Sequence, residues 1–146
     1  MASYGGGVDK YSSLSSLFHH GLASDGNKSY IVGSFTETSD GTIWFSTEQQ
    51  GLFKIDSNQK TSKIKLKIDS NIRQVLSDKN NNLWIRTENK SLYMFSPKLN
   101  NIVEHTKWQN ESNYLSSQMA IMSDNNIWYI NQQGIITRYN VNTQNF

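Results

Sequence analysis

The sequence has no cysteine, a single proline and no long apolar stretch. The lack of cysteine excludes disulfide scaffolds and cysteine-based zinc sites, and it is compatible with either redox compartment. No apolar run approaches the roughly 20 residues that a membrane-spanning helix needs, so we expect no direct insertion into a membrane. The first residues, MASYGGGVDKYSS, carry neither the basic start nor the apolar core of an export signal.

The sequence also lacks an excess of charge of one sign. Its 14 basic and 12 acidic residues leave a net charge of +2 over 146 residues. A balance this close to neutrality provides no basic surface for phosphates, so we expect no nucleic-acid partner. Aromatic residues make up 12% of the chain, which argues against disorder. The length is sufficient for one domain with its own core.

What the sequence does contain is a repeat built around tryptophan. Trp44, Trp84 and Trp128 are separated by 40 and 44 residues. Each follows an Asp-Gly or Asn-rich turn, whose residues tolerate the positive φ that tight hairpins need. A polar break and a second strand-like segment follow each tryptophan. The three copies read SDGTIWFSTEQQGLFKID at 39–56, DKNNNLWIRTENKSLYMFS at 78–96 and SDNNIWYINQQGIITRYN at 123–140.

A period of about 40 to 45 residues with one tryptophan per unit is typical of four-stranded propeller blades. The second strand of each unit carries the tryptophan, and the third follows the polar break. We expect the innermost strands at 30–37, 72–77 and 116–122, and the outermost near 63–67 and 102–106, with 16–20 as an N-terminal copy. No segment shows helical periodicity. The predicted fold is therefore all-β, a β-propeller fragment of about three to three and a half four-stranded antiparallel blades.

The repeat divides residues 1–146 into parts of a propeller. Residues 7–29 supply outer strands of a first blade, and further units lie at 30–68, 69–108 and 109–146, the last of them partial. Propellers typically close with about 4 to 8 blades, so this chain is too short to close a ring by itself. Its open edges invite another chain. We expect head-to-tail self-association, most simply as a homodimer, or pairing with the remainder of a longer propeller.

The repeat resembles the two-component regulator propeller repeat. That family reads roughly Asp-Gly-x-Leu-Trp-Ile-Gly-Thr, then Gly-Gly-Leu, an aromatic or aliphatic residue, and Asp or Asn. The resemblance covers nearly the whole chain, as two full and two partial units. The third unit departs from it, with Asn131 in place of the threonine. The residues to which we assign a structural role in the repeat are Trp44, Thr47, Gly51, Trp84, Thr87, Trp128 and Gly134.

The resemblance implies a function. Such repeats form the extracytoplasmic sensor of hybrid two-component proteins, common in gut bacteria that live on polysaccharides, and their usual ligand is an oligosaccharide. It implies a periplasmic, non-catalytic sensing module without a cofactor, whose signal passes to a histidine kinase outside this chain. Two alternatives stay open, namely a fragment of a propeller-type polysaccharide lyase or hydrolase, and a structural assembly unit that binds no ligand.

Aromatic side chains are the first candidates for a sugar site. We expect the three repeated tryptophans to fill gaps between neighbouring sheets. Trp108 and Tyr114 lie outside the repeat, between the outer strand of one unit and the inner strand of the next. In propellers that connection runs over the usual ligand face. Both residues are therefore candidates for stacking on a sugar ring, the alternative being that they pack at the base of a loop.

Charged side chains are the second group of candidates. Arg86 stands where the family has glycine, on the same strand face as Trp84. It can stack with its charge at the edge, or it can make a bidentate contact to a carboxylated sugar or a neighbouring subunit. We expect the loops near 69–73, 88–90 and 107–114 to share one face, which adds Arg73 and Glu88 to the site.

No metal site or catalytic group is expected. His19 and His20 are adjacent, so on a strand they point to opposite faces and cannot readily bind one metal ion. The sequence shows no nucleophile with a base in a recognisable order. Acidic Glu48 and Glu88 occupy corresponding loops, which repetition explains better than catalysis.

Overall fold

Strands are the only regular elements in the described part of the computed structural model, which covers residues 2–3, 7–10, 19–21, 31–89, 91–107, 118–130, 134, 136–141 and 143. The described strands form four antiparallel sheets, so the predicted all-β fold is confirmed. Within these ranges no helix has the length and apolar character needed to cross a membrane.

In every sheet the hydrogen-bonded neighbours are strands consecutive in the chain. The first sheet contains β1 (Ala2–Ser3), β2 (Gly7–Lys10) and β3 (His19–Gly21). The second contains β4 (Val32–Glu37), β5 (Ile43–Thr47), β6 (Gly51–Ile55) and β7 (Thr61–Ile64). The third contains β8 (Ile72–Ser77), β9 (Leu83–Thr87), β10 (Ser91–Ser96) and β11 (Asn101–Lys107). The fourth contains β12 (Gln118–Ile121), β13 (Ile127–Ile130) and β14 (Ile136–Tyr139).

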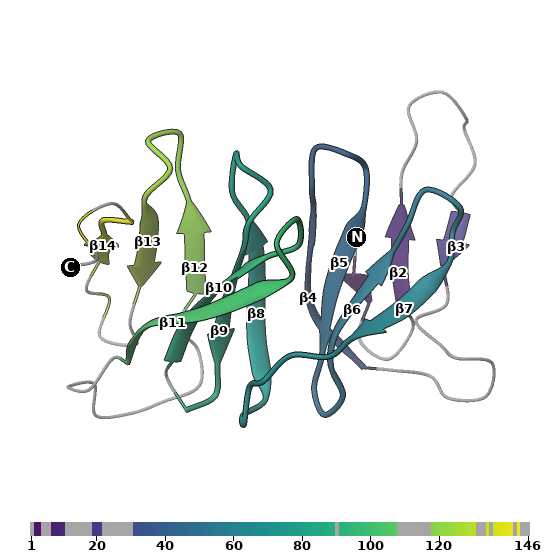
Figure 1. Cartoon of the computed structure of the whole chain (residues 1–146), viewed down its shortest axis with the longest axis horizontal. Helices are drawn as coiled ribbons and strands as arrows, with labels where there is room; N and C mark the ends of the chain where they lie inside the picture. The colour runs from purple at the N-terminus through teal and green to yellow at the C-terminus, as the bar shows by residue number, and fades with distance from the viewer. Residues whose placement is uncertain are drawn as a thin grey trace.

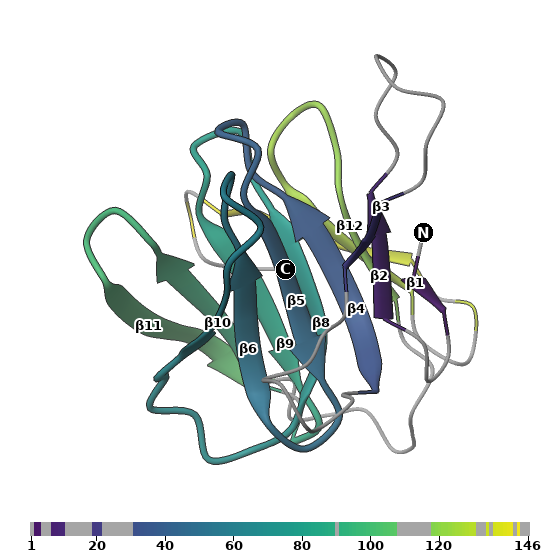
Figure 2. The same cartoon turned by 90° about the vertical axis from the view of Figure 1, so that its right-hand side faces the viewer.

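The four sheets follow one another across the molecule in chain order, with the N-terminal sheet at the right of Figure 1. The second and third sheets lie face to face (Figure 2). The first strands of successive sheets are neighbours, since β8 contacts both β4 and β12. This is the arrangement of propeller blades, in which the first strand of each blade lies nearest the axis.

One outer strand differs from its expected position. The sequence predicted the outer strand of the second sheet near residues 63–67, but β7 spans Thr61–Ile64. Pairing starts early because Asp56 accepts hydrogen bonds from the backbone amides of Asn58 and Lys60, at 2.9 and 3.0 Å, and so closes a tight turn directly before β7. Leu66 and Ile68 lie beyond the strand, yet they pack against the core between the second and third sheets.

The hairpin before each tryptophan has one repeated geometry. The amides of Gly41, Asn81 and Asn125 donate to the carbonyl three residues earlier, at 2.8–2.9 Å. Each of these residues has a positive φ, of 80°, 63° and 62°. This is a short hairpin loop closed by a left-handed residue. The Asp-Gly, Asn-Asn and Asp-Asn pairs recognised in the sequence are thus turns in which only the second residue needs the left-handed conformation.

Trp44 and Trp84 fill successive gaps between sheets. Trp44 is 5% exposed and packs in the core between the second and third sheets, with Leu83 and Phe95 among its neighbours. Trp84 is completely buried between the third and fourth sheets, edge-on to the ring of Tyr139 at 6.3 Å. These tryptophans therefore provide apolar contact that joins the second sheet to the third and the third to the fourth.

A polar partner satisfies the indole of each of these tryptophans. Trp44 Nε1 donates to Thr38 Oγ1 and Trp84 Nε1 donates to Asp78 Oδ2, both at 3.1 Å. Thr38 and Asp78 lie six residues before their tryptophans and begin the hairpin turn. The corresponding residue before Trp128 is Met122, which is half exposed and offers no oxygen acceptor. The Nε1 atom of Trp128 is buried without a hydrogen-bond partner.

Besides lacking a hydrogen-bond partner, Trp128 is less buried than the sequence predicted. Its side chain is only half-buried, because no described sheet follows the fourth one and covers that face. Ile130 and Ile136, which face each other across β13 and β14, are also exposed on this side.

Polar side chains add a second, repeated link between sheets. Ser34 Oγ accepts the amide hydrogen of Val75 at 3.1 Å. At the corresponding position in the third sheet, the Gln74 side chain bonds both the amide and the carbonyl of Met119, at 2.8 and 2.9 Å. A side chain of β4 or β8 thus reaches the backbone of the next first strand, which holds adjacent sheets in register.

Replacing Trp84 by alanine should lower the free energy of unfolding by about 3–5 kcal/mol, because a fully buried aromatic leaves a cavity when it is truncated. Trp128→Ala should lower it by only about 1–2 kcal/mol, because less apolar surface is lost. Urea titrations followed by circular dichroism measure both values. Equal losses for the two variants would contradict the packing described.

Met122→Thr should stabilise the protein by about 1 kcal/mol, because the new hydroxyl can accept the unpaired hydrogen of Trp128 Nε1. The neighbouring Asp124 suits a threonine here, as Asp40 accompanies Thr38 in the second sheet. The control is the same substitution in a Trp128→Phe background, which has no indole donor. A gain that persists in that background would show that the indole plays no part.

Candidate functional site

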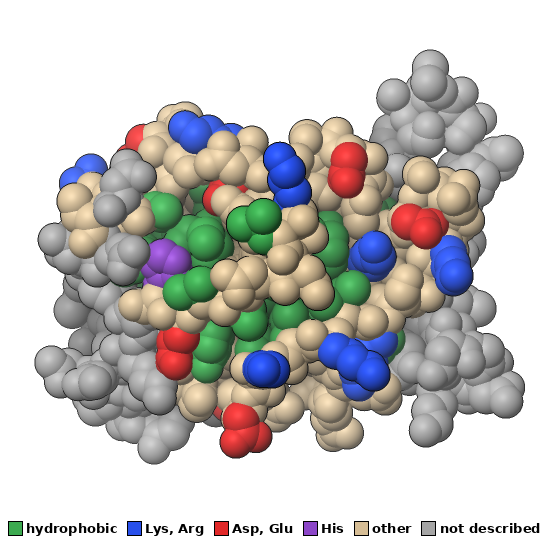
Figure 3. Space-filling view, viewed as in Figure 1, with side chains coloured by type: hydrophobic (Ala, Val, Ile, Leu, Met, Phe, Trp, Pro, Cys, Tyr) green, Lys and Arg blue, Asp and Glu red, His purple; other side chains and the backbone are tan. Residues whose placement is uncertain are grey.

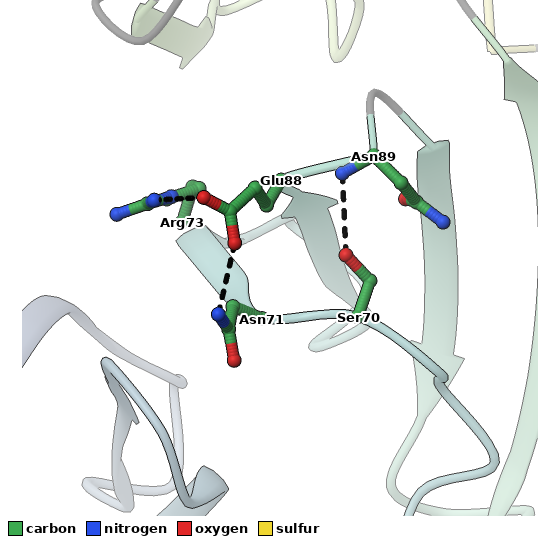
Figure 4. Close-up of polar contacts among 5 residues, drawn as sticks. All are labelled: Ser70, Asn71, Arg73, Glu88 and Asn89. Carbon is green, nitrogen blue, oxygen red and sulfur yellow. Dashed lines mark hydrogen bonds and ion pairs between the residues drawn. The ribbon is translucent and has the colours of Figure 1, made fainter.

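Two loops of the third sheet meet at one corner of the molecule (Figure 4). The amide of Glu88, just after β9, donates to the carbonyl of Asn71, just before β8, at 2.8 Å. The Asn71 side chain donates to Glu88 Oε2 at 2.8 Å, and Arg73 forms an ion pair with Oε1 of the same carboxylate. The amide of Asn89 donates to Ser70 Oγ at 3.2 Å. We call these five residues the third-sheet corner.

The charges of this corner favour an ionised Glu88. The hydrogen bond from Asn71 lowers the pKa of the Glu88 carboxyl below its usual value, and the hydrogen bond and charge of Arg73 lower it further. The side chains of Arg73 and Glu88 are 33% and 43% exposed. Such an exposed pair adds little stability, so its effect is to hold two loops in a defined geometry.

Arg86 lies beside the corner, in the gap between the third and fourth sheets. It stands directly opposite Gln74 in the β8–β9 pairing, and Gln74 points at the fourth sheet. The Nε atoms of both Arg86 and Arg73 are buried without a hydrogen-bond partner. The pKa of Arg86 is lowered, mainly because the guanidinium is buried. The nearby Tyr129 opposes this shift, and the positive charge of Arg73 adds to it. The two guanidinium groups are therefore close enough to interact.

Comparison with the second sheet shows what is special about this corner. The backbone bond between the two loops is present in both sheets, since the amide of Glu48 donates to the carbonyl of Ile31 at 3.2 Å. The side chains differ. Where the third sheet has Asn71, Arg73 and Arg86, the second has Ile31, Gly33 and Ser46. Three substitutions within a repeat thus converge on one place, while the acidic residue of the loop is kept.

The candidates from the sequence are placed as follows. Arg73 and Glu88 are in contact, and Arg86 is near them. Trp108 and Tyr114 lie outside the described residues. Asn71 and Ser70 were not singled out, although aligning the repeats would have found Asn71, because the second sheet has isoleucine at that position.

The structural residues of the repeat close hairpins. The buried hydroxyl of Thr47 accepts the amide hydrogen of Gln50 at 3.0 Å, and that of Thr87 accepts the amide hydrogen of Ser91 at 3.1 Å. Gly51 and Gly134 have φ values of 89° and 78°, a region that favours glycine. Asn131, the departure in the third unit, lies outside the described residues.

A pocket of about 300 Å³ opens next to the corner, between the second and third sheets. Its lining combines apolar side chains such as Leu66 and Ile68 with Lys63, Lys65 and the corner residue Ser70. Figure 3 shows hydrophobic side chains gathered at the centre of the outer-strand face, with Lys and Arg side chains around them. The pocket thus offers both apolar surface and hydrogen-bond donors.

The described residues hold no group of three side chains that could bind a metal ion. His105, the one histidine whose side chain is described, lies against Trp84 with ring centres 4.9 Å apart. Its Nδ1 is 3.1 Å from the hydroxyl of Tyr139, and burial lowers the pKa of the imidazole. Its contacts are those of a core residue.

Glu88→Gln should destabilise the protein only slightly at neutral pH, because Arg73 and Asn71 lose a charged acceptor in an exposed pair. The folded-state pKa of Glu88 lies below its ordinary value of 4.5. The stabilisation is therefore present above that value and is lost as the pH falls through the lower, folded-state pKa. Unfolding curves at several pH values should show that the difference in free energy of unfolding between Glu88→Gln and wild type decreases as the pH falls. Glu48→Gln, in the matching loop without an arginine, is the control, and an equal effect there would contradict the role of Arg73.

Comparison with known proteins agrees with the fold. Residues 25–49 match the family described as two component regulator propeller. A 97-residue stretch is 30% identical to histidine kinase P4 of Formosa agariphila, and it covers 56% of this chain but 7% of the kinase.

Similar solved structures include virginiamycin B lyase from Staphylococcus aureus, with a TM-score of 0.61 and 20% identity over 87% of this chain and 46% of the lyase. The extracellular domain of a one-component system protein from B. thetaiotaomicron has a TM-score of 0.57 and 18% identity, over 85% of this chain and 18% of that one. The chain therefore spans less than half of either structure, and identities this low show the fold alone. Residues 25–49 of this β-propeller chain thus match the repeat described as two component regulator propeller.

Proposed function

We propose that this chain is a ligand-sensing part of an extracytoplasmic propeller in a hybrid two-component histidine kinase, and that its ligand is a poly- or oligosaccharide. The repeat family, the kinase relative and the extracellular structural neighbour support the sensor role. The observation that carries the proposal is the third-sheet corner together with the adjacent Arg86. Asn71, Arg73 and Arg86 stand there in place of Ile31, Gly33 and Ser46 of the second sheet. Departures from a repeat that gather in one place are typical of a functional site.

The chemistry of the corner suits sugar hydroxyl groups. An ionised carboxylate accepts hydrogen bonds from hydroxyls, while guanidinium and amide groups donate to them. Glu88, Arg73 and Asn71 supply all three on two loops whose backbones are bonded to each other. The adjacent pocket offers apolar surface for the face of a ring. We propose that Trp108 and Tyr114, in the connection to the fourth sheet, add stacking surfaces to the same site.

The state of Glu88 favours sensing over cleavage. A carboxyl that acts as a general acid on a glycosidic bond needs a raised pKa. Hydrogen bonds and the charge of Arg73 lower the pKa of Glu88 instead. It is therefore suited to remain a fixed hydrogen-bond acceptor. We propose a non-catalytic module that needs no cofactor, with the kinase reaction in another part of the parent protein.

Calorimetric titration with a panel of oligosaccharides tests the proposal. At least one oligosaccharide should bind saturably. Arg73→Ala and Trp108→Ala should each lower the affinity for that oligosaccharide by roughly tenfold, which is the effect of one lost charged hydrogen bond or stacking contact. Trp44→Phe and Lys60→Ala are the controls and should bind as wild type, since both lie away from the corner. Failure of every sugar to bind would contradict the proposal, and cleavage of a polysaccharide in a parallel assay would favour the lyase or hydrolase alternative.

A second candidate function, as an assembly unit, is favoured by the outer face of the fourth sheet. Ile130 and Ile136 are 47% and 61% exposed there, next to the half-buried Trp128. Gln118 is exposed on the same face, at the position from which Ser34 and Gln74 reach the next sheet. This face therefore presents the same contact groups that join the sheets inside the molecule.

We propose that a second copy of the chain occupies this face, its N-terminal sheet continuing the row of sheets. Sedimentation velocity at micromolar concentration should show a dimer or a larger species. Ile136→Glu should shift it to monomer, whereas Leu99→Glu, at a 73% exposed turn position, should not. A stable, folded wild-type monomer would contradict the proposal.

A further inference from the structure

Among the described residues, Arg86 is a largely buried cation that no carboxylate pairs with. Its Nε atom is buried and unpaired, and within the described ranges no carboxylate forms an ion pair with it. Burial lowers its pKa, and the like charge of Arg73 adds to this effect against the opposing influence of Tyr129. Buried charges in proteins are normally paired, but the described part of the chain supplies no such partner for this guanidinium.

Arg73 does not relieve this imbalance. One terminal nitrogen of its guanidinium binds Glu88, but its Nε is also buried without an acceptor. The carboxylate of Glu88 is shared with Asn71. Two positive groups thus stand beside one negative group, and unused donors remain on both arginines.

The fold itself does not need these arginines. The second sheet pairs its first two strands in the same register, including the same irregularity before Ser34 and Gln74, with Gly33 and Ser46 in their places. Ser46 is buried and its hydroxyl lies 3.4 Å from the carbonyl oxygen of Ser34, a neutral contact. The charges of the third sheet are therefore additional to what the sheet needs in order to form.

We propose that Arg86, together with Arg73, binds an oxyanion of the ligand, either the carboxylate of an acidic sugar or a sulfate ester. Both groups match the planar, multi-donor guanidinium, which binds such oxygens in pairs. An anion here would supply the acceptors that both Nε atoms lack. This inference rests on the proposed sensing function, because it specifies the class of saccharide that the same corner recognises.

Inorganic sulfate and sodium glucuronate are the probes, with glucose as the neutral comparison and sodium chloride used to hold the ionic strength constant. Sulfate or glucuronate should raise the Tm of the wild type saturably, and glucose should not. Arg86→Met keeps an unbranched apolar stem and should weaken the response at least tenfold. Arg138→Met, which removes an exposed arginine from β14, should leave it unchanged. An equal response in Arg86→Met and wild type would overturn the inference.

The stability of the ligand-free protein provides a second readout. Removing an unpaired, desolvated charge should raise the urea midpoint of Arg86→Met or leave it unchanged. An arginine with a purely structural role would lower the midpoint when it is replaced. A clear loss of stability in Arg86→Met would therefore overturn the inference even if the anion response also disappears.

The two proposals fail in different ways. Wild-type affinity of Arg86→Met for a neutral oligosaccharide, with no anion response in any variant, overturns the oxyanion site and leaves the sensing function in place. An anion response that depends on Arg86, without binding of any oligosaccharide, supports the oxyanion site and contradicts the saccharide ligand.

Discussion

Burial of one tryptophan between the second and third sheets, and of another between the third and fourth, is the contact on which this molecule depends. The side chain bridges two sheets, and its indole hydrogen is bonded to the residue that begins the preceding turn. That bond links the packing between sheets to the hairpin within a sheet. It explains why a side-chain oxygen acceptor, Thr38 or Asp78, stands six residues before each of these two tryptophans.

The same repetition makes exceptions informative. In the second sheet the corresponding place between the first two strands holds isoleucine, glycine and serine, and the serine hydroxyl makes a neutral contact with the carbonyl of Ser34. In the third sheet the same backbone carries asparagine and two arginines around a retained glutamate. Since the backbone bond between the loops is common to both sheets, the added charges are not required for folding. In a repeating scaffold, one sheet can therefore have a polar site while the neighbouring sheets retain only the residues needed for packing.

The fold was predictable because the tryptophan period and the turn residues are local signals that recur. The early start of β7 was not, because the alternation of Lys63 to Ile68 looks like a strand while the Asp56 turn decides where pairing begins. The exposure of Trp128 was not predictable either, because it depends on whether another sheet covers that face, and the residues of its own repeat do not show this. Arg73 and Glu88 were assigned from the sequence to loops expected to share one face, but their contact with Asn71 depends on two loops meeting in space.

The central claim is that the third sheet is the packing scaffold of the second with a polar site added to it. A triple variant, Asn71→Ile, Arg73→Gly and Arg86→Ser, gives these three positions the residues of the second sheet and tests this most directly. Its thermal unfolding, followed by circular dichroism without ligand, should remain a single cooperative transition with a Tm close to that of the wild type. Loss of the cooperative transition would contradict the account, because it would make these residues part of the fold.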